Sequence, residues 1–346
     1  MVEIAKKAFV ATLVAVAVVV SALALWKLKL IISLLFLAVI IAAAMQPGID
    51  ALRRRRVPRG VGILVHYAGL FGVVALLLWL VVPRARDQIS EAIGNLPTAT
   101  KNSTGIKHEI LKYIQQKLNH LPSGGSLVHP ALTIGVKAFE VLIGIFFTFA
   151  AAAYWTFERT RAQRLVTSLL PRNKRKVVWD TWNLIDLKLG AFVRGQLLLI
   201  LLVGTVLSIA FRIIGLPYWI LVGIFAGIVE IVPVIGPLTA GVVAVGVGFT
   251  ESWQTALAAG ICVLVVRLLE DYIVIPKVLG EAVGLSPLVV LVSVTAVGIL
   301  FGGFAVLLAV PFAAVLATLV DVVLLDKDPA EEEVPTVLFP AKDAEA

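Results

Sequence analysis

The sequence predicts an all-α fold, a polytopic transmembrane helical bundle with about eight hydrophobic segments and broken or re-entrant helices in its C-terminal half. Three observations lead to this prediction. The chain is 60% hydrophobic and only 15% charged, and its mean hydropathy of +1.00 lies outside the usual range of soluble domains. Several of its apolar segments are long enough to cross a bilayer. Clusters of Arg and Lys flank these segments, which is the pattern that sets orientation in a membrane.

The N-terminal region, residues 1–82, contains three predicted transmembrane segments at about 8–25, 30–45 and 61–82. The densest positive cluster lies between the second and the third, and consists of Arg53, Arg54, Arg55, Arg56 and Arg59. The positive-inside rule places these topology-determining arginines, and therefore the N-terminus, in the cytoplasm. A cleavable signal peptide over residues 8–25 is the alternative. It is disfavoured because apolar sequence resumes directly after Lys29, as in a transmembrane hairpin.

The middle of the chain alternates between polar and apolar regions. Residues 83–130 have mixed charge and a helical stripe of apolar residues, which predicts amphipathic helices on the extracytoplasmic side. Residues 131–157 form the fourth transmembrane segment. Residues 158–190 carry many Arg and Lys residues and end in an amphipathic stretch, which predicts a second cytoplasmic loop. The four crossings agree with a cytoplasmic N-terminus.

Residues 191–325 are predicted to form the transport core, and its sixth apolar segment, residues 215–250, is interrupted at the middle. Glu230, Pro233, Gly236 and Pro237 occur there, although hydrocarbon disfavours a carboxylate and proline breaks a helix. The sequence therefore predicts two half-helices, the second starting near Gly236 and Pro237. Broken helices at membrane depth persist only where protein or a water-filled cavity satisfies the free backbone groups. In transporters that cavity is typically the binding site.

The seventh segment, residues 253–275, contains charged residues within its apolar sequence. Arg267 precedes Glu270 by three positions and Asp271 by four, so one helical face presents a cation to two acids, and Pro276 follows. A structural salt bridge is one interpretation. Charges at the water boundary with extended side chains are another. A proton or substrate relay is the third.

The eighth segment, residues 288–323, suggests an internal repeat of the sixth. Each begins after a Gly-Leu-Pro or Gly-Leu-Ser-Pro sequence and continues to a break, which in the eighth segment consists of Gly302, Gly303 and later Pro311. Paired interrupted segments indicate a transporter binding site. The alternative is that Gly-rich faces serve close helix packing, including packing in a homo-oligomer. The sequence leaves open whether these segments are full crossings or re-entrant hairpins. Residues 326–346 are acidic and Pro-rich, which predicts a disordered cytoplasmic tail.

Several functional classes are disfavoured by composition. The single Cys262 and four scattered His residues form no metal motif, and no cofactor or nucleotide-binding motif is present. An enzyme is not expected, because no nucleophile and base motif occurs at helical spacing. The formal charge of +8 arises largely from the clusters that flank apolar segments, so a lipid bilayer and not nucleic acid is the expected partner.

Motifs of the C-terminal half resemble the autoinducer-2 exporter family of bacterial and archaeal membrane proteins. The resemblance covers the fifth to the eighth segments and rests on LGAFVRGQ at 189–196, GLPY at 215–218, EIVPVIGP at 230–237, LEDYIVIPKVLG at 269–280, LSPL at 285–288 and LAVP at 308–311. It implies an eight-segment permease that exports autoinducer-2 or exchanges sodium or lithium for protons. The chain departs from the family pattern at Arg267, where relatives often have glutamine, and at Phe304, where a further glycine is common.

The leading hypothesis is a multi-pass transporter of the inner (plasma) membrane that moves a small polar molecule, in which alternating access occurs around the broken segments. Glu230, Pro233, Gly236 and Pro237 would form the unwound centre. Glu270 and Asp271 would carry a proton or a polar contact, and Arg267 would pair or gate. A sodium(lithium)/proton antiporter is the first alternative. A non-transporting membrane scaffold or sensor is the second alternative. Both termini are expected to lie in the cytoplasm.

Overall fold

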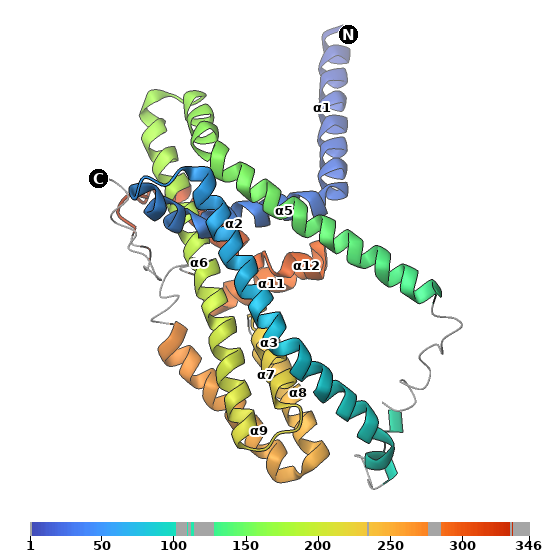
Figure 1. Cartoon of the computed structure of the whole chain (residues 1–346). Coiled ribbons are helices and arrows are strands. Elements are labelled where there is room, and N and C mark those ends of the chain that lie inside the picture. The colour runs from blue at the N-terminus through green and yellow to red at the C-terminus, as the bar shows by residue number, and fades with distance from the viewer. Residues whose placement is uncertain are drawn as a thin grey trace.

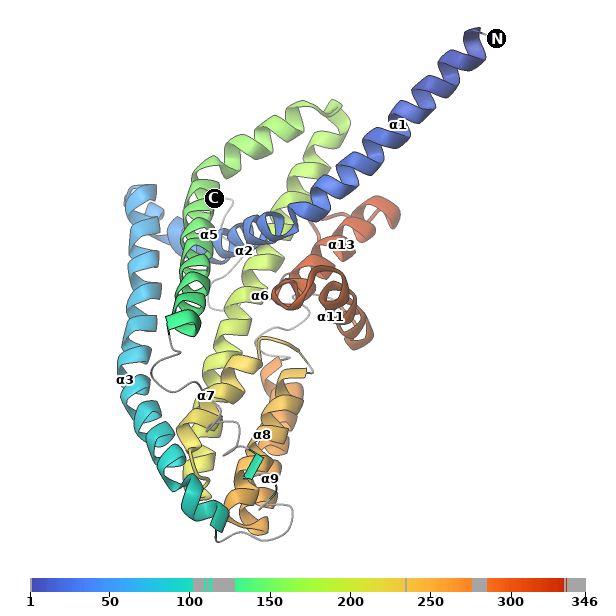
Figure 2. The same cartoon turned by 90° about the vertical axis from the view of Figure 1, so that its right-hand side faces the viewer.

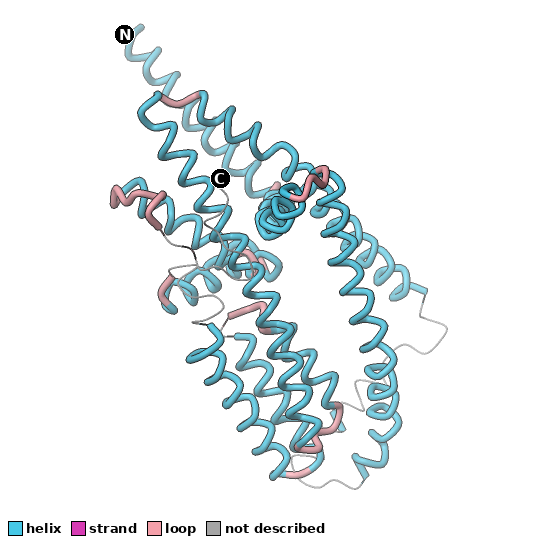
Figure 3. The backbone as a smooth tube through the Cα atoms, turned by 60° about the vertical axis from the view of Figure 1, so that its left-hand side comes forward, coloured by secondary structure: helices cyan, strands magenta, loops and turns pink. Residues whose placement is uncertain are grey.

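The computed structural model describes residues 2–101, 109, 112–113, 128–233, 235–275, 285–332 and 334. Within these residues all regular structure is helical and no strand occurs, which confirms the predicted all-α class (Figure 3). Five helices contain spans long and apolar enough to cross a membrane. They are α1 (Val2–Lys27), α2 (Lys29–Arg54), α3 (Arg59–Lys101), α5 (Val128–Ser168) and α6 (Arg172–Ile213).

The remaining elements are shorter and follow α6 along the chain. They are α7 (Trp219–Val229), α8 (Ile235–Glu251), α9 (Trp253–Leu269), the π-helical turn η1 (Glu270–Val274), α11 (Pro287–Phe301), α12 (Gly303–Val306) and α13 (Ala309–Leu324). At about 1.5 Å per residue, the 11 residues of α7 span about 16 Å, which is too short to cross a hydrocarbon core of about 30 Å.

Helix α6 is the element against which the others are arranged (Figure 1). It packs against α2 and α5 on the N-terminal side of the chain, and against α7, α9 and α13 on the C-terminal side. By contrast, α1 projects from the bundle and its apolar side chains are exposed along its length (Figure 1). A helix that is hydrophobic on all sides needs an apolar surrounding, which a bilayer provides.

Helices α7 and α8 form a hairpin that lies along the C-terminal half of α6. One buried apolar cluster contains Val222 and Ala226 of α7 together with Ala240 and Ala244 of α8. Residues on opposite sides of the break therefore pack side by side, so the chain reverses direction at the break. Figure 2 shows α7, α8 and α9 grouped at one end of α6. The sixth segment is thus a helical hairpin in this structure.

Glycines allow α7 to approach α6 closely. A Cβ atom at Gly227 would lie 2.7 Å from the carbonyl oxygen of Ile200 and 2.8 Å from the Cα atom of Gly204. Gly223, one turn earlier, has no room for a Cβ atom beside the backbone of Ser208. This small-xxx-small spacing is typical of helix contacts in membranes, where packing replaces the hydrophobic effect.

Helices α11, α12 and α13 form a second hairpin along the N-terminal half of α6. Val290, Val294 and Val297 of α11 pack beside Val306 and Val310, which follow the break. Leu308, directly before α13, packs with Leu189 of α6, and Thr318 of α13 accepts a hydrogen bond from Lys188 of α6. Both interrupted segments therefore fold back on themselves, as the predicted repeat would require.

Two boundaries differ from those expected. Helix α3 continues without a break from the third apolar segment to Lys101, so residue 82 is not a helix end. Most of the predicted amphipathic region at 83–130 beyond Lys101 lies outside the described residues. At the C-terminus disorder was expected from residue 326, but Pro329 is buried and Glu332 bonds to Lys188. This contact joins Glu332 to a buried lysine of α6, which composition alone does not reveal.

Candidate functional site

The first break separates α7 from α8 at the predicted residues. Helix α7 ends at Val229 and α8 begins at Ile235, so Glu230 and Pro233 lie between them. The turn is closed by the Gly236 amide, which donates to the Val232 carbonyl oxygen at 2.8 Å. A Cβ atom at Gly236 would collide with the Val229 carbonyl. Pro237 lies in the first turn of α8, where its missing N–H group costs no helical hydrogen bond.

Gln196 of α6 satisfies a backbone group that the break leaves free. Its side-chain Nε2 donates to the backbone carbonyl oxygen of Glu230 at 2.8 Å, and both residues are buried. A carbonyl group buried without a partner would cost about 1 to 3 kcal/mol. The tip of the α7–α8 hairpin is therefore held to α6 by a polar contact in addition to apolar packing.

A buried charged cluster lies beside this tip. Arg267 of α9 contacts Glu230 at 3.5 Å, Glu270 at 3.3 Å and Asp271 at 2.8 Å. Glu230 and Glu270 are 4% and 2% exposed, whereas the Asp271 side chain is 41% exposed. Arg267 thus pairs with both acids of its own segment, one of the interpretations of the sequence, and Glu230 joins it from the break between α7 and α8. Three carboxylates share one guanidinium, so the cluster has the capacity to accept a further cation, a proton or hydroxyl groups.

The π-helical turn Glu270–Val274 follows Arg267 directly. A π-helical turn inserts one extra residue into the helical repeat and occurs frequently at functional sites. Here the turn begins at Glu270, which is buried, whereas Tyr272, two positions later, is exposed. Pro276, predicted to belong to the same site, lies outside the described residues.

The second break begins at Gly302. This residue has φ 92° and ψ 174°, a conformation almost restricted to glycine, and it caps the end of α11. Gly303 starts the short α12, and the chain then turns into α13. Pro311 lies in the first turn of α13 and is among the most deeply buried side chains. The predicted break is therefore a change of direction at Gly302 and a second turn before Ala309.

The two breaks approach each other beside α6. One apolar cluster contains Phe192 of α6, Val232 of the first break, and Val306, Ala309 and Val310 around the second. Since Gln196 binds the first tip and Leu189 packs against Leu308, the two hairpin tips meet along residues 189–196 of α6. The predicted residues of both breaks are thereby brought to one region of the fold.

The same stretch of α6 is anchored to α2. A Cβ atom at Gly190 would lie 2.6 Å from the carbonyl oxygen of Ala43, and Arg194 Nη1 donates to the carbonyl oxygen of Ala44 at 3.1 Å. Arg194 therefore connects α6 to α2. Gln196 and Arg194 both belong to the LGAFVRGQ motif at 189–196. The motif did not predict these contacts, because the partners of both residues lie elsewhere in the fold.

The two basic clusters used to predict topology lie at the same end of the bundle. Arg53, Arg54, Arg55, Arg56 and Arg59 occupy the end of α2, the turn and the start of α3. Gly60 at the start of α3 faces the ring of Phe157 in α5, directly before the second basic cluster. The start of α3, beside the first cluster, therefore contacts α5 directly before the second cluster.

A cavity of about 570 Å³ lies between α2, α5, α6 and α13. Its lining is mainly apolar and includes Phe36, Trp155, Trp182, Leu189, Val315 and Leu319. Within the described residues no group of three or more His, Cys, Asp or Glu side chains suited to a metal ion was found.

These features define a multi-pass helical membrane protein in which two helical hairpins meet beside a partly buried charged cluster. The chain belongs to the AI-2E transporter family, because the family model described as "AI-2E family transporter" matches residues 13–325. It is therefore a membrane transporter by family.

Similar proteins carry names of the same kind. The chain is 27% identical over 308 residues to a Bacillus subtilis protein named "Putative transport protein YrrI", covering 84% of this chain and 85% of that protein. It is 27% identical to "Putative transport protein YueF" of the same organism, covering 86% of each. It is 29% identical over 195 residues to "Putative permease PerM" of Escherichia coli K12, covering 55% of this chain and 52% of that protein.

Proposed function

We propose that the protein moves a small polar solute across the inner (plasma) membrane by alternating access around the two hairpin tips. The observation that carries this proposal is the meeting of both tips along residues 189–196 of α6, beside the cluster of Arg267, Glu230 and Glu270. Interrupted helices that end at a shared region are the arrangement on which transporters build their solute sites.

Each predicted site residue has a proposed role in this scheme. Pro233, Gly236 and Pro237 keep the first tip unwound, while Gly302, Gly303 and Pro311 shape the second. Glu230, Glu270 and Asp271 offer carboxylate oxygens to solute hydroxyl groups, and Arg267 holds these carboxylates in place. Movement of one hairpin relative to α6 would open the region between the tips to one side of the membrane and then to the other.

The solute class follows from the chemistry of the cluster. Carboxylates that exceed their cationic partner favour a polyhydroxylated neutral molecule, which includes autoinducer-2-like signals, over an anion. The family name supports the same class. A cation exchanged for protons would use the same carboxylates, and the experiment below separates the two.

The test is flux into sealed liposomes that contain the purified protein. A pH-sensitive dye is followed while sodium or lithium is added, and autoinducer-2 is measured in parallel. Solute movement without a dye response, lost in Glu230→Gln, supports the proposed transporter. Glu251→Gln is the matched control, because Glu251 is an exposed glutamate at the far end of α8. A cation-dependent dye response would indicate antiport. Absence of any flux would favour a scaffold or sensor.

A further inference from the structure

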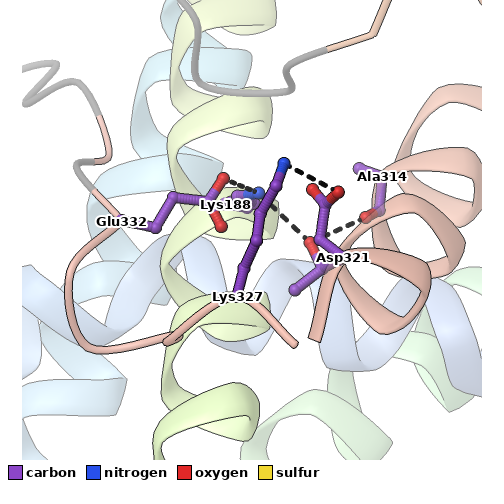
Figure 4. A network of polar contacts seen from close by, with 6 residues as sticks. Lys188, Ala314, Asp321, Lys327 and Glu332 are labelled. Atoms are coloured by element: carbon purple, nitrogen blue, oxygen red, sulfur yellow. Dashed lines mark hydrogen bonds and ion pairs between the residues drawn. The ribbon is translucent and has the colours of Figure 1, made fainter. Parts of the chain in front are cut away.

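The chain continues beyond α13 as an ordered C-terminal arm, residues 325–332, that folds back on the bundle (Figure 4). Lys327 Nζ pairs with Asp321 Oδ1 at 2.9 Å, and the Lys327 amide donates to the Asp321 carbonyl oxygen. The hydrogen bond to Asp321 raises the pKa of Lys327. The Ala330 amide then donates to Asp328 Oδ1 at 2.9 Å, and Pro329 is buried.

The arm ends on a buried lysine of α6. Lys188 Nζ donates to Glu332 Oε1 at 2.5 Å and to the Thr318 hydroxyl at 3.2 Å. The Lys188 side chain is 6% exposed, and Thr318 is fully buried. The Thr318 hydroxyl donates its own proton to the Ala314 carbonyl oxygen, so it faces Lys188 as an acceptor (Figure 4).

Glu332 is the carboxylate that neutralises this lysine. Asp186 lies two residues away on α6, but it is bound to Arg159 at 2.5 Å. An ammonium group buried without a charged partner is strongly unfavourable. Among the residues that the structure describes, the ion pair that joins the arm to α6 is the one between Lys188 and Glu332, and the Glu332 side chain is 34% exposed and open to competition by solvent.

The position of this bond connects the arm to the second hairpin tip. Lys188 is followed by Leu189, which packs with Leu308 at the start of α13, and Thr318 lies further along the same helix. The bound arm thus joins the C-terminal end of α13 to α6 at Lys188. The alternating-access scheme lets either hairpin move relative to α6, and α13 belongs to the second.

We propose that the C-terminal arm is an autoinhibitory latch, in which Glu332 bound to Lys188 holds the α11–α13 hairpin against α6 and limits the rate of transport. This inference rests on the proposed function. Release of Glu332 leaves the transport residues intact, so the released protein transports faster.

Docking of the arm is measured first, by the reactivity of an introduced thiol. In a Cys262→Ser background, Pro329→Cys places a thiol at a buried position of the arm. Adding Glu332→Gln is expected to raise its rate of reaction with a water-soluble maleimide about tenfold, equivalent to about 1.4 kcal/mol. Glu331→Gln removes the same charge from the same arm and is expected to leave the rate unchanged, because Glu331 is exposed and its amide bonds within the arm.

The restraint on the hairpin is measured by hydrogen exchange and by flux, in the chain with native Pro329. Glu332→Gln is expected to accelerate amide exchange in α11–α13 and to raise flux several-fold, whereas Glu331→Gln does neither. Equal thiol reactivity in the two variants, or unchanged exchange in α11–α13, overturns the latch. Faster exchange with unchanged flux in a protein that transports also overturns it. If the wild-type protein moves no solute, the proposed function fails and exchange still decides whether the arm restrains the hairpin.

Discussion

The side-chain amide of Gln196 in α6 donates to the backbone carbonyl of Glu230 at the end of α7, with 2.8 Å between donor and acceptor. The bond joins the unwound first tip to the helix that both hairpins share. It also fixes where Glu230 begins to leave the helix, and hence the direction of its carboxylate toward Arg267.

Gln196→Leu should lower both stability and transport. The Glu230 carbonyl loses its donor, which is expected to cost about 1 to 3 kcal/mol, and the tip loses its anchor on α6. Thermal unfolding in detergent and liposome flux measure the two effects. Gln163→Leu is the control, because Gln163 is a buried glutamine of α5 bound to Asn183, away from both tips. Equal flux loss in both variants would mean that Gln196 contributes only general stability.

Gly227→Ala should destabilise the protein by about 1 to 3 kcal/mol, since its Cβ atom would overlap the backbone of α6. Gly246→Ala in α8 should instead be neutral or stabilising by up to about 1 kcal/mol, because nothing lies within 4 Å of its Cβ position. Melting temperatures of the two purified variants test the difference. Similar melting temperatures would contradict the close α6–α7 contact.

Arg267→Gln should destabilise the protein by roughly 2 to 4 kcal/mol, because it leaves Glu230 and Glu270 buried without their cation. The loss is below that of a fully buried pair, since the Arg267 side chain is 28% exposed. Adding Glu270→Gln to Arg267→Gln should recover part of the loss by removing one unpaired charge. A double-mutant cycle measures this coupling. Strictly additive effects would show that Arg267 and Glu270 are not coupled.

Gly302→Ala should cost about 1 to 3 kcal/mol through backbone strain alone, since its φ of 92° disfavours any residue with a Cβ atom and there is open space around it. Gly303→Ala is the matched control, because Gly303 also has open space but begins α12 without a positive φ. Chemical or thermal unfolding of both variants tests the prediction. A larger loss in Gly303→Ala would place the bend elsewhere.

Local chemistry explains which features could be predicted from sequence. Pro233 and Pro237 lack an amide donor wherever the chain places them, and Gly302 tolerates a conformation that other residues avoid, so both breaks were predictable. Arg267, Glu270 and Asp271 lie within one helical turn, and their pairing follows from spacing alone.

The remaining contacts depend on the packing of distant helices. Gln196 and Glu230 are 34 positions apart, and Lys188 and Glu332 are 144 apart. No periodicity in one segment predicts a partner at such a distance. The sequence likewise did not decide whether the chain reverses direction at the first break, because prolines and glycines permit both a kinked crossing and a hairpin. The burial of Val222 and Ala226 against Ala240 and Ala244 decides between them.

The length of α6 has a consequence for how the two hairpins communicate. Its 42 residues extend for about 63 Å, roughly twice the thickness of a hydrocarbon core, as one continuous helix. Both tips contact this helix within residues 189–196, so a tilt of α6 changes the surroundings of both at once. By thermodynamic linkage, if arm binding at Lys188 changes the affinity for a solute by some factor, solute binding changes the affinity of Lys188 for the arm by the same factor.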